Sequence, residues 1–145
     1  MIEMMINSAE LTFISRSVNE RFARMSVAAF ATQLDPTVEE LAEIKTAVSE
    51  AVTNCIVHAY GSDLGTIKMK MQLFDSNVLR ITVRDFGRGI DDVEKAMEPC
   101  CSTGADDRAA MGFTIMESFS DRLRVSSKPG KGTKVVMERK IVKRG

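Results

Sequence analysis

Several residue types are scarce in this 145-residue chain: tryptophan is absent, histidine occurs once and cysteine three times. A single histidine, His58, and the lack of paired Cys-x-x-Cys sequences argue against a zinc site. Cys55, Cys100 and Cys101 cannot all pair with one another, so we expect a reducing, cytoplasmic setting. No apolar run approaches the ~20 residues of a membrane span, and the short apolar start lacks the basic region of a signal peptide.

The chain also lacks net charge, because 20 Lys and Arg balance 20 Asp and Glu. Without a positive excess we expect no direct contact with nucleic acid. The balance nevertheless hides an uneven distribution: residues 1–60 carry 4 basic and 8 acidic side chains, 61–121 carry 7 and 11, and 122–145 carry 9 and 1. We interpret the basic end mainly as a charged sheet edge that discourages strand pairing.

The remaining composition is that of an ordinary folded protein, with 44% hydrophobic and 28% charged residues. The length predicts one domain over residues 1–145. Hydrophobic periodicity and turn residues predict, in chain order, a strand over 9–14, helices over 17–33 and 37–59, strands over 66–74 and 78–83, a short helix over 91–97, an irregular stretch over 99–110, a helix over 111–119 and strands over 122–127 and 133–141. Thr37 and Glu40 form a capping-box pattern at the second helix. This order predicts an α+β fold, a two-layer α/β sandwich whose mixed, mostly antiparallel sheet has helices on one face.

The first candidate site is Glu50-x-x-x-Asn54, with His58 four residues further along the same predicted helix. These side chains project from one helix face, one turn apart. Glu50 is suited to accept a proton and Asn54 to offer its carbonyl oxygen to a hard cation. On the spacing alone, a solvated polar stripe is the more common explanation.

Two further candidates are glycine-bearing segments. Asp85-Phe86-Gly87-Arg88-Gly89 follows a predicted strand, where Gly87 and Gly89 would allow the backbone to approach a ligand closely. The stretch from Ser102 and Thr103 through Arg108 to Gly112 would open a helix, a place where free N–H groups and Arg108 favour an anion. An ordinary turn and an ordinary surface loop are the alternatives.

Taken in order, these motifs resemble the GHKL ATP-binding fold, which includes gyrase, histidine kinases and mismatch-repair ATPases. The match runs from the helical E-x-x-x-N through D-x-G-x-G and the Gly112 loop to Gly132-Thr133. The stretches Val48-Ser49-Glu50-Ala51-Val52-Thr53-Asn54 and Met111-Gly112-Phe113-Thr114-Ile115-Met116-Glu117 are most similar to the anti-sigma F factor family, serine kinases of endospore-forming bacteria.

The resemblance implies an activity and roles for particular residues. It implies ATP or ADP with Mg²⁺, and transfer of a phosphoryl group to a serine of an anti-anti-sigma factor. It assigns Glu50 as the base, Asn54 to Mg²⁺, Asp85 with Thr133 to adenine, and Arg108 with Gly112 to the phosphates; Gly87, Gly89, Ser102 and Thr103 complete the nucleotide site. It further implies that a homodimer binds sigma F through the first helix, where Glu20 and Arg24 lie one turn apart.

The chain departs from the family pattern in its third motif. Ala110-Met111-Gly112 stands where the family usually has Gly-Met-Gly, and Cys100-Cys101-Ser102-Thr103 stands where it often has a threonine pair and a lysine. These departures leave a second hypothesis, a non-catalytic, nucleotide-dependent sigma-binding module. A related kinase of a stress-response sigma factor is a further alternative. A detached histidine kinase domain is disfavoured, because no separate helix carries a phosphoacceptor histidine.

Overall fold

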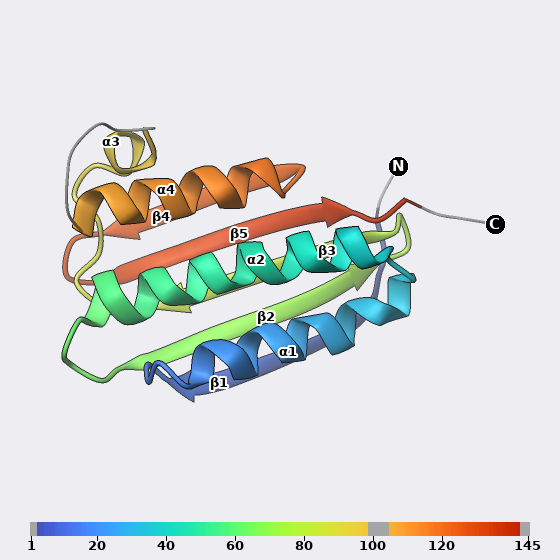
Figure 1. The fold of residues 1–145 in the computed structure, drawn as a ribbon, viewed down its shortest axis with the longest axis horizontal. Helices are drawn as coiled ribbons and strands as arrows, with labels where there is room; N and C mark the ends of the chain where they lie inside the picture. The colour runs from blue at the N-terminus through green and yellow to red at the C-terminus, as the bar shows by residue number, and fades with distance from the viewer. Residues whose placement is uncertain (1–2, 99–104, 143–145) are drawn as a thin grey trace.

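Five strands form one sheet in the computed structural model, which describes residues 3–98 and 105–142, without the side chains of 105–108. The strands are β1 (Met5–Ile14), β2 (Thr66–Phe74), β3 (Val78–Asp85), β4 (Arg122–Lys128) and β5 (Gly132–Lys140). Their order across the sheet is β1-β2-β3-β5-β4, and each neighbouring pair is antiparallel. The fifth strand in the chain therefore lies inside the sheet, between β3 and β4 (Figure 1).

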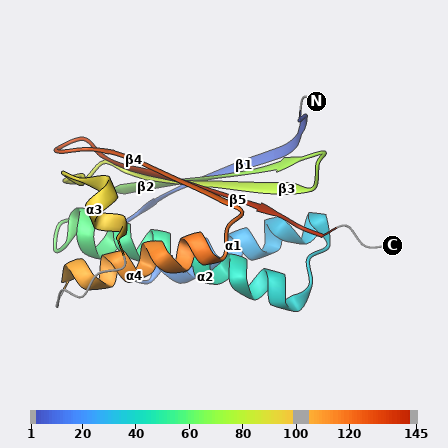
Figure 2. The same ribbon diagram turned by 90° about the horizontal axis from the view of Figure 1, so that it is seen from above.

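The helices cover one face of this sheet and leave the other face open (Figure 2). They are α1 (Asn19–Ala31), α2 (Val38–Asn54), α3 (Val93–Met97) and α4 (Ala105–Ser118), with a 3₁₀ turn over Thr32–Leu34 and a π-helical segment over Cys55–Tyr60 that continues α2. Helix α2 lies between α1 and α4 (Figure 1). None of the helices within residues 3–98 and 105–142 is long and apolar enough to cross a bilayer.

The core lies between the helices and the sheet because each element has one apolar side. Along β2, Ile67, Met69, Met71 and Leu73 are buried, whereas Lys68 and Lys70 point to the open face. Helix α2 contributes Ile44, Val48 and Val52 to the same core. The alternation in the strands and the helical stripe in α2 thus meet face to face, as a two-layer sandwich requires.

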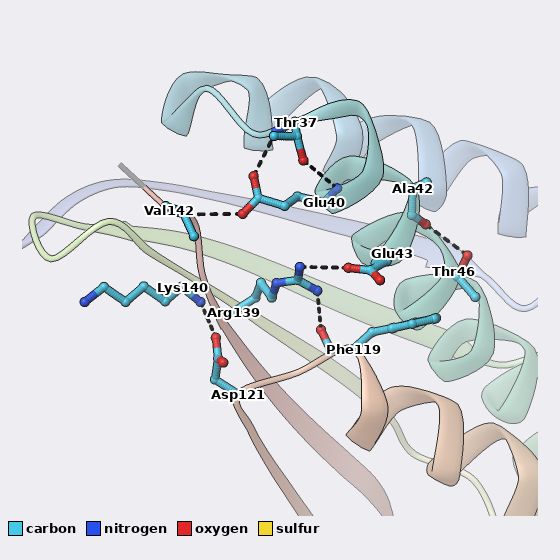
Figure 3. A network of polar contacts seen from close by, with 10 residues as sticks. All are labelled: Thr37, Glu40, Ala42, Glu43, Thr46, Phe119, Asp121, Arg139, Lys140 and Val142. Atoms are coloured by element: carbon cyan, nitrogen blue, oxygen red, sulfur yellow. Dashed lines mark hydrogen bonds and ion pairs between the residues drawn. The ribbon is translucent and has the colours of Figure 1, made fainter. Parts of the chain in front are cut away.

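The start of α2 is fixed by a capping box that also binds the end of β5 (Figure 3). The Thr37 hydroxyl accepts from the Glu40 N–H at 3.0 Å, and the Glu40 carboxylate accepts from the Thr37 N–H at 2.8 Å. The second Glu40 oxygen accepts from the N–H of Val142 at 3.2 Å. Nearby, Arg139 donates to the Glu43 carboxylate at 2.8 Å and to the Phe119 carbonyl at 3.0 Å. These contacts hold the first half of α2, the end of α4 and the end of β5 together.

Most of the predicted elements are confirmed, and two expectations are wrong. The sheet has no parallel pair among its five described strands, so it is antiparallel rather than mixed. The irregular stretch expected over 99–110 is helical from Ala105 onward, while its first part lies outside the described residues. Asp106 and Asp107 favour the N-terminal turn of a helix, and Ala109 and Ala110 are strong helix formers.

Candidate functional site

Helices α2 and α4 bring two of the predicted motifs together. A Cβ atom built on Gly112 of α4 would lie 3.0 Å from Oε2 of Glu50 and 3.3 Å from both polar side-chain atoms of Asn54. Only a residue without a side chain fits this contact at its present distance. The structure therefore places Glu50, Asn54 and Gly112 in one cluster, although Gly112 is far from the other two in the chain.

Asn54 carries a buried polar atom that no neighbour satisfies. Its Nδ2 has no hydrogen-bond partner among the described residues. Leaving a buried amide group unpaired costs roughly 1–3 kcal/mol, so such groups in folded proteins call for an explanation such as a ligand or an ordered water. The orphaned amide beside Glu50 and Gly112 fits a polar ligand seated between α2 and α4.

Asp85 ends β3 as a buried carboxylate with an exposed fraction of 3%. Its Oδ1 accepts from the backbone N–H of Gly87 at 3.0 Å and of Thr133 at 3.2 Å. Burial raises the pKa of Asp85, and these two N–H groups and the thiol of Cys55 oppose that rise. The predicted pair of Asp85 and Thr133 therefore lies together, with the carboxylate held in one orientation.

The π-helical segment adds two residues that the sequence reasoning missed. Cys55 is buried against Asp85, and burial together with that negative charge raises the pKa of its thiol well above 9.0. The Tyr60 hydroxyl donates to the Thr66 carbonyl at 2.6 Å and accepts from the Phe86 N–H at 2.7 Å. Insertions of π-helix are frequent at functional sites. The sequence signal for these two residues is their position, because Cys55 directly follows Asn54 and Tyr60 directly precedes Gly61, which ends the helix.

The glycines of the D-x-G-x-G segment make close contacts inside the protein, so packing against the backbone already requires residues without a side chain there. A Cβ on Gly87 would lie 2.4 Å from the Ala59 carbonyl oxygen, and one on Gly89 would lie 2.1 Å from that of Lys128. Gly132, with φ of +100°, would similarly meet the Asp85 carbonyl oxygen at 2.1 Å. These glycines pack the end of β3 against its neighbours, and this packing holds the Thr133 N–H within hydrogen-bond distance of the Asp85 carboxylate.

The third motif is placed differently from the prediction. Gly112 lies well inside α4, not at its start, because the helix already begins at Ala105. Ala110 is buried in the same helix, where positive φ is not required. The Arg108 backbone lies in the first turn of α4, and its side chain is outside the description. Ser102 and Thr103 lie outside the described residues.

The remaining predicted residues do not join this cluster. Arg24 Nε lies 3.4 Å from Glu20 Oε1 on α1, with 34% and 24% of the two side chains exposed. Helix α1 packs on the side of α2 opposite to α4 (Figure 1). His58 lies in the π-helical segment and is half-buried. Over the described ranges, no group of three or more His, Cys, Asp or Glu side chains is arranged to hold a metal ion.

Comparison with known proteins agrees with this architecture. The histidine kinase-like ATPase domain family matches residues 15–139. The anti-sigma F factor of Caldanaerobacter subterraneus subsp. tengcongensis is 57% identical over 136 residues, 93% of this chain and 94% of that protein. The anti-sigma F factors of Clostridium acetobutylicum and Geobacillus kaustophilus are each 49% identical, with coverage of 95% or more of this chain and 96% of each relative.

Solved structures share the fold at low sequence identity. The RsbU and RsbW domains of Rv1364c from Mycobacterium tuberculosis superpose with a TM-score of 0.71 at 18% identity, covering 97% of this chain and 34% of that one. The histidine kinase domain of the blue-light activated histidine kinase EL346 from Erythrobacter litoralis superposes with a TM-score of 0.55 at 23% identity. This match covers 81% of this chain and 59% of that one. These likenesses establish the two-layer architecture.

Proposed function

The chain belongs to the anti-sigma F factor family of histidine kinase-like ATPase domains, and from this premise we propose that it is an ATP-dependent serine kinase that also sequesters a sigma factor. The substrate is a serine of an anti-anti-sigma factor, and the sequestered protein is sigma F. The observation that carries the proposal is the cluster of Glu50, the orphaned Asn54 amide and Gly112, with the buried Asp85 and Thr133 at the end of β3.

The residues present fit a magnesium nucleotide. Asp85, fixed by the N–H groups of Gly87 and Thr133, is a hydrogen-bond acceptor for the adenine edge. Asn54 Oδ1 is an oxygen of the kind Mg²⁺ prefers, whereas its buried Nδ2, which lacks a partner among the described residues, is a donor suited to a phosphate oxygen. Gly87 and Gly89 are proposed to let the backbone approach the nucleotide closely. Ser102, Thr103 and the α4 turn with Arg108 complete the proposed phosphate end of the site. Bound Mg²⁺ would neutralise phosphate charge.

Glu50 is the proposed general base. Its carboxylate faces Gly112 beside Asn54, which supports a position next to the proposed phosphate end of the site. A carboxylate takes the proton of the substrate serine only when held within hydrogen-bond reach, about 3 Å, of the serine hydroxyl. The rest of the catalysis is positioning and charge stabilisation. Gly112 contributes by leaving the space beside both side chains free.

Sigma binding is proposed for α1, around Glu20 and Arg24, on a cytoplasmic homodimer made of single domains over residues 1–145. The support from this chain is an ion pair of 3.4 Å and an apolar stripe next to it, in which Val18, Phe22 and Met25 are exposed. A partly exposed i, i+4 Glu–Arg pair contributes only a few tenths of a kcal/mol to folding. We predict that Arg24→Glu abolishes capture of sigma F in a pull-down while ATP affinity is unchanged; equal loss of ATP binding would contradict this docking face.

The kinase assay uses the full chain, labelled ATP, Mg²⁺ and the anti-anti-sigma partner. The wild type should label a partner serine. Glu50→Gln should bind ATP normally and lose transfer by about 10²-fold or more, as expected for removing a general base. Glu39→Gln, an exposed change on the same helix, is the matched control and should transfer normally. Asp85→Asn should weaken ATP binding itself.

The competing function is a non-catalytic, nucleotide-dependent sigma-binding module, which the altered third motif favours. Such a module would hold sigma F in an ATP-dependent complex and never consume ATP. Normal ATP binding by the wild type without any transfer would support the module and overturn the kinase. Normal transfer by Glu50→Gln would overturn only the base assignment. Replacing sigma F by a stress-response sigma factor in the pull-down distinguishes the related stress regulator.

A further inference from the structure

The open face of the sheet, on the side away from the helices, carries a concentration of positive charge. A shallow hollow of about 620 Å³ on this face is lined by Lys68, Lys70, Arg80, Arg84, Arg124 and Lys134, together with neutral side chains and Glu10. We call these six residues the basic face. Figure 2 shows that none of the helices within the described residues covers this side of the sheet. Glu50, Asn54 and Gly112 lie in the helical layer, so the basic face is separate from the proposed nucleotide site.

Strand register places like charges directly opposite one another. Lys68 on β2 pairs with Arg84 on β3, and Arg84 pairs with Lys134 on β5. Adjacent strands are about 4.8 Å apart, and like charges in directly opposed positions destabilise a sheet. Three cations in a row across β2, β3 and β5 therefore work against folding, which indicates that they serve another purpose.

Acidic side chains neutralise only part of this charge. Glu138 contacts Arg80 at 2.6 Å, and also Arg122 at 3.8 Å. Lys68 and Arg84 lie 5.8 and 5.0 Å from the centre of the Phe86 ring, a cation–π contact that leaves their charge in place. Among the ion pairs of the described residues, none includes Arg84, Arg124 or Lys134. The face keeps an excess of positive charge held on rigid strands.

We propose that the basic face is a docking surface for an acidic polypeptide segment in an extended conformation. Side chains on one face of a strand repeat every ~6.7 Å, so alternate acidic residues of an extended segment match the spacing of Lys68 and Lys70. A second copy of this chain is disfavoured, since its own face would bring the same charge. Nucleic acid is disfavoured because the exposed Phe86 ring at this face is engaged by Lys68 and Arg84 instead of being free for base stacking.

The test measures anisotropy of a fluorescein-labelled peptide of alternating glutamate and threonine against the full chain. Binding should weaken as salt rises, because exposed charge pairs are screened. The triple variant Lys68→Gln, Arg84→Gln, Lys134→Gln should lose about tenfold or more in affinity, as expected when several charges leave an interface. The matched control, Arg16→Gln, Arg21→Gln, Lys45→Gln, removes the same charge elsewhere and should bind like the wild type. Lys68→Arg with Lys134→Arg keeps the charge and should also bind.

Folding does not confound this test, because removing opposed like charges should leave stability unchanged or raised, as circular dichroism and urea unfolding would show. Equal loss in both triple variants would overturn the proposal, since it would mean a non-specific charge effect. Tighter binding of single-stranded DNA through the same three residues would overturn it in favour of nucleic acid. Wild-type sedimentation as a dimer that the basic-face triple variant alone dissociates would overturn it in favour of a second copy.

Discussion

At the scale of single residues, a substitution of Gly112 should lower activity without lowering stability. Gly112→Ala places a methyl group 3.0 Å from Glu50 Oε2 and 3.3 Å from the Asn54 amide, so those side chains must move by a few tenths of an ångström. Alanine stabilises a helix interior by roughly 0.5–1 kcal/mol relative to glycine. We therefore predict that phosphoryl transfer falls markedly while the free energy of unfolding is unchanged or slightly higher.

The measurement pairs a transfer assay with urea unfolding. Met111→Ala, at an exposed position of the same helix, is the control and should retain transfer. If Gly112→Ala transferred phosphate at the wild-type rate, the contact between α4 and the Glu50–Asn54 pair would have no part in the reaction.

Glu40 gives a second prediction at this scale, a pH dependence of stability. The Thr37 N–H above all, then the Val142 N–H and the Arg139 charge, lower the pKa of Glu40 below 4.5, and burial opposes them. The ionised carboxylate therefore stabilises the fold above about pH 4.5, and this contribution is lost as the pH falls through the lower folded pKa. Glu40→Gln should cost about 1 kcal/mol at pH 7, and the difference from wild type should shrink in acid. Urea unfolding of both proteins at several pH values measures this difference in the free energy of unfolding. A difference that does not change with pH would contradict the role of the Glu40 charge.

The sequence predicts which site residues lie together where they are close to one another in the chain. Glu50 and Asn54 are one turn apart on a helix, so their shared face follows from helical geometry alone. Cys55 against Asp85, and Tyr60 between Thr66 and Phe86, depend on how the π-helical segment meets the end of β3. Residues this far apart in sequence, brought together by one irregular turn, leave no periodic signal.

At the scale of elements, Arg139 joins three of them. It links β5 to Glu43 of α2 and to the carbonyl at the end of α4, with distances of 2.8 and 3.0 Å (Figure 3). Arg139→Met keeps much of the apolar stem and leaves the half-buried Glu43 without its partner. Hydrogen bonds to charged groups contribute about 1.5–3 kcal/mol, so we predict a loss near 2 kcal/mol in urea unfolding. Lys140→Met, whose amine lies in solvent, is the control and should change stability little; an equal loss there would exclude a specific role for Arg139.

The predicted boundaries of helices and strands are wrong where the same residues suit both a loop and a helix. The small residues of Ala105–Ala110 are also common in loops and predict an irregular stretch, yet its aspartates and alanines suit the first turns of α4. The predicted Thr37–Glu40 capping box, by contrast, is confirmed, because both partners lie within one helical turn.

At the scale of the whole molecule, nucleotide should stabilise the fold. A ligand at 100 times its Kd adds about 2.7 kcal/mol when only the folded state binds it, which for a chain of this size raises Tm by about 5–10 °C. We predict such a rise with Mg-ATP in the wild type and in Glu50→Gln, and a much smaller one in Asp85→Asn. Thermal unfolding monitored by circular dichroism measures it, and the absence of any rise in the wild type would contradict nucleotide binding.

The charge distribution shows what composition predicts for the whole molecule and what it misses. The basic end of the chain predicts a charged sheet edge, and β4, with Arg122, Arg124 and Lys128, is indeed an edge strand. Strand β5 is not, because it lies inside the sheet. Lys134 therefore joins Lys68 and Arg84 on one face, an arrangement that requires the strand order and register.

That strand order also determines how the protein can be made. Strand β5 is fifth in the chain but sits between β3 and β4, so during synthesis the inner edge of β3 stays unpaired until residues 132–140 have left the ribosome. Until then the nascent chain presents an exposed, pairing-competent strand edge, the kind of surface that templates aggregation. Nor can the contacts of Glu43 with Arg139 and of Glu40 with Val142 form earlier, since Arg139 lies in β5 and Val142 follows it. The sheet and its helical layer are thus completed together, once residues 132–142 have emerged.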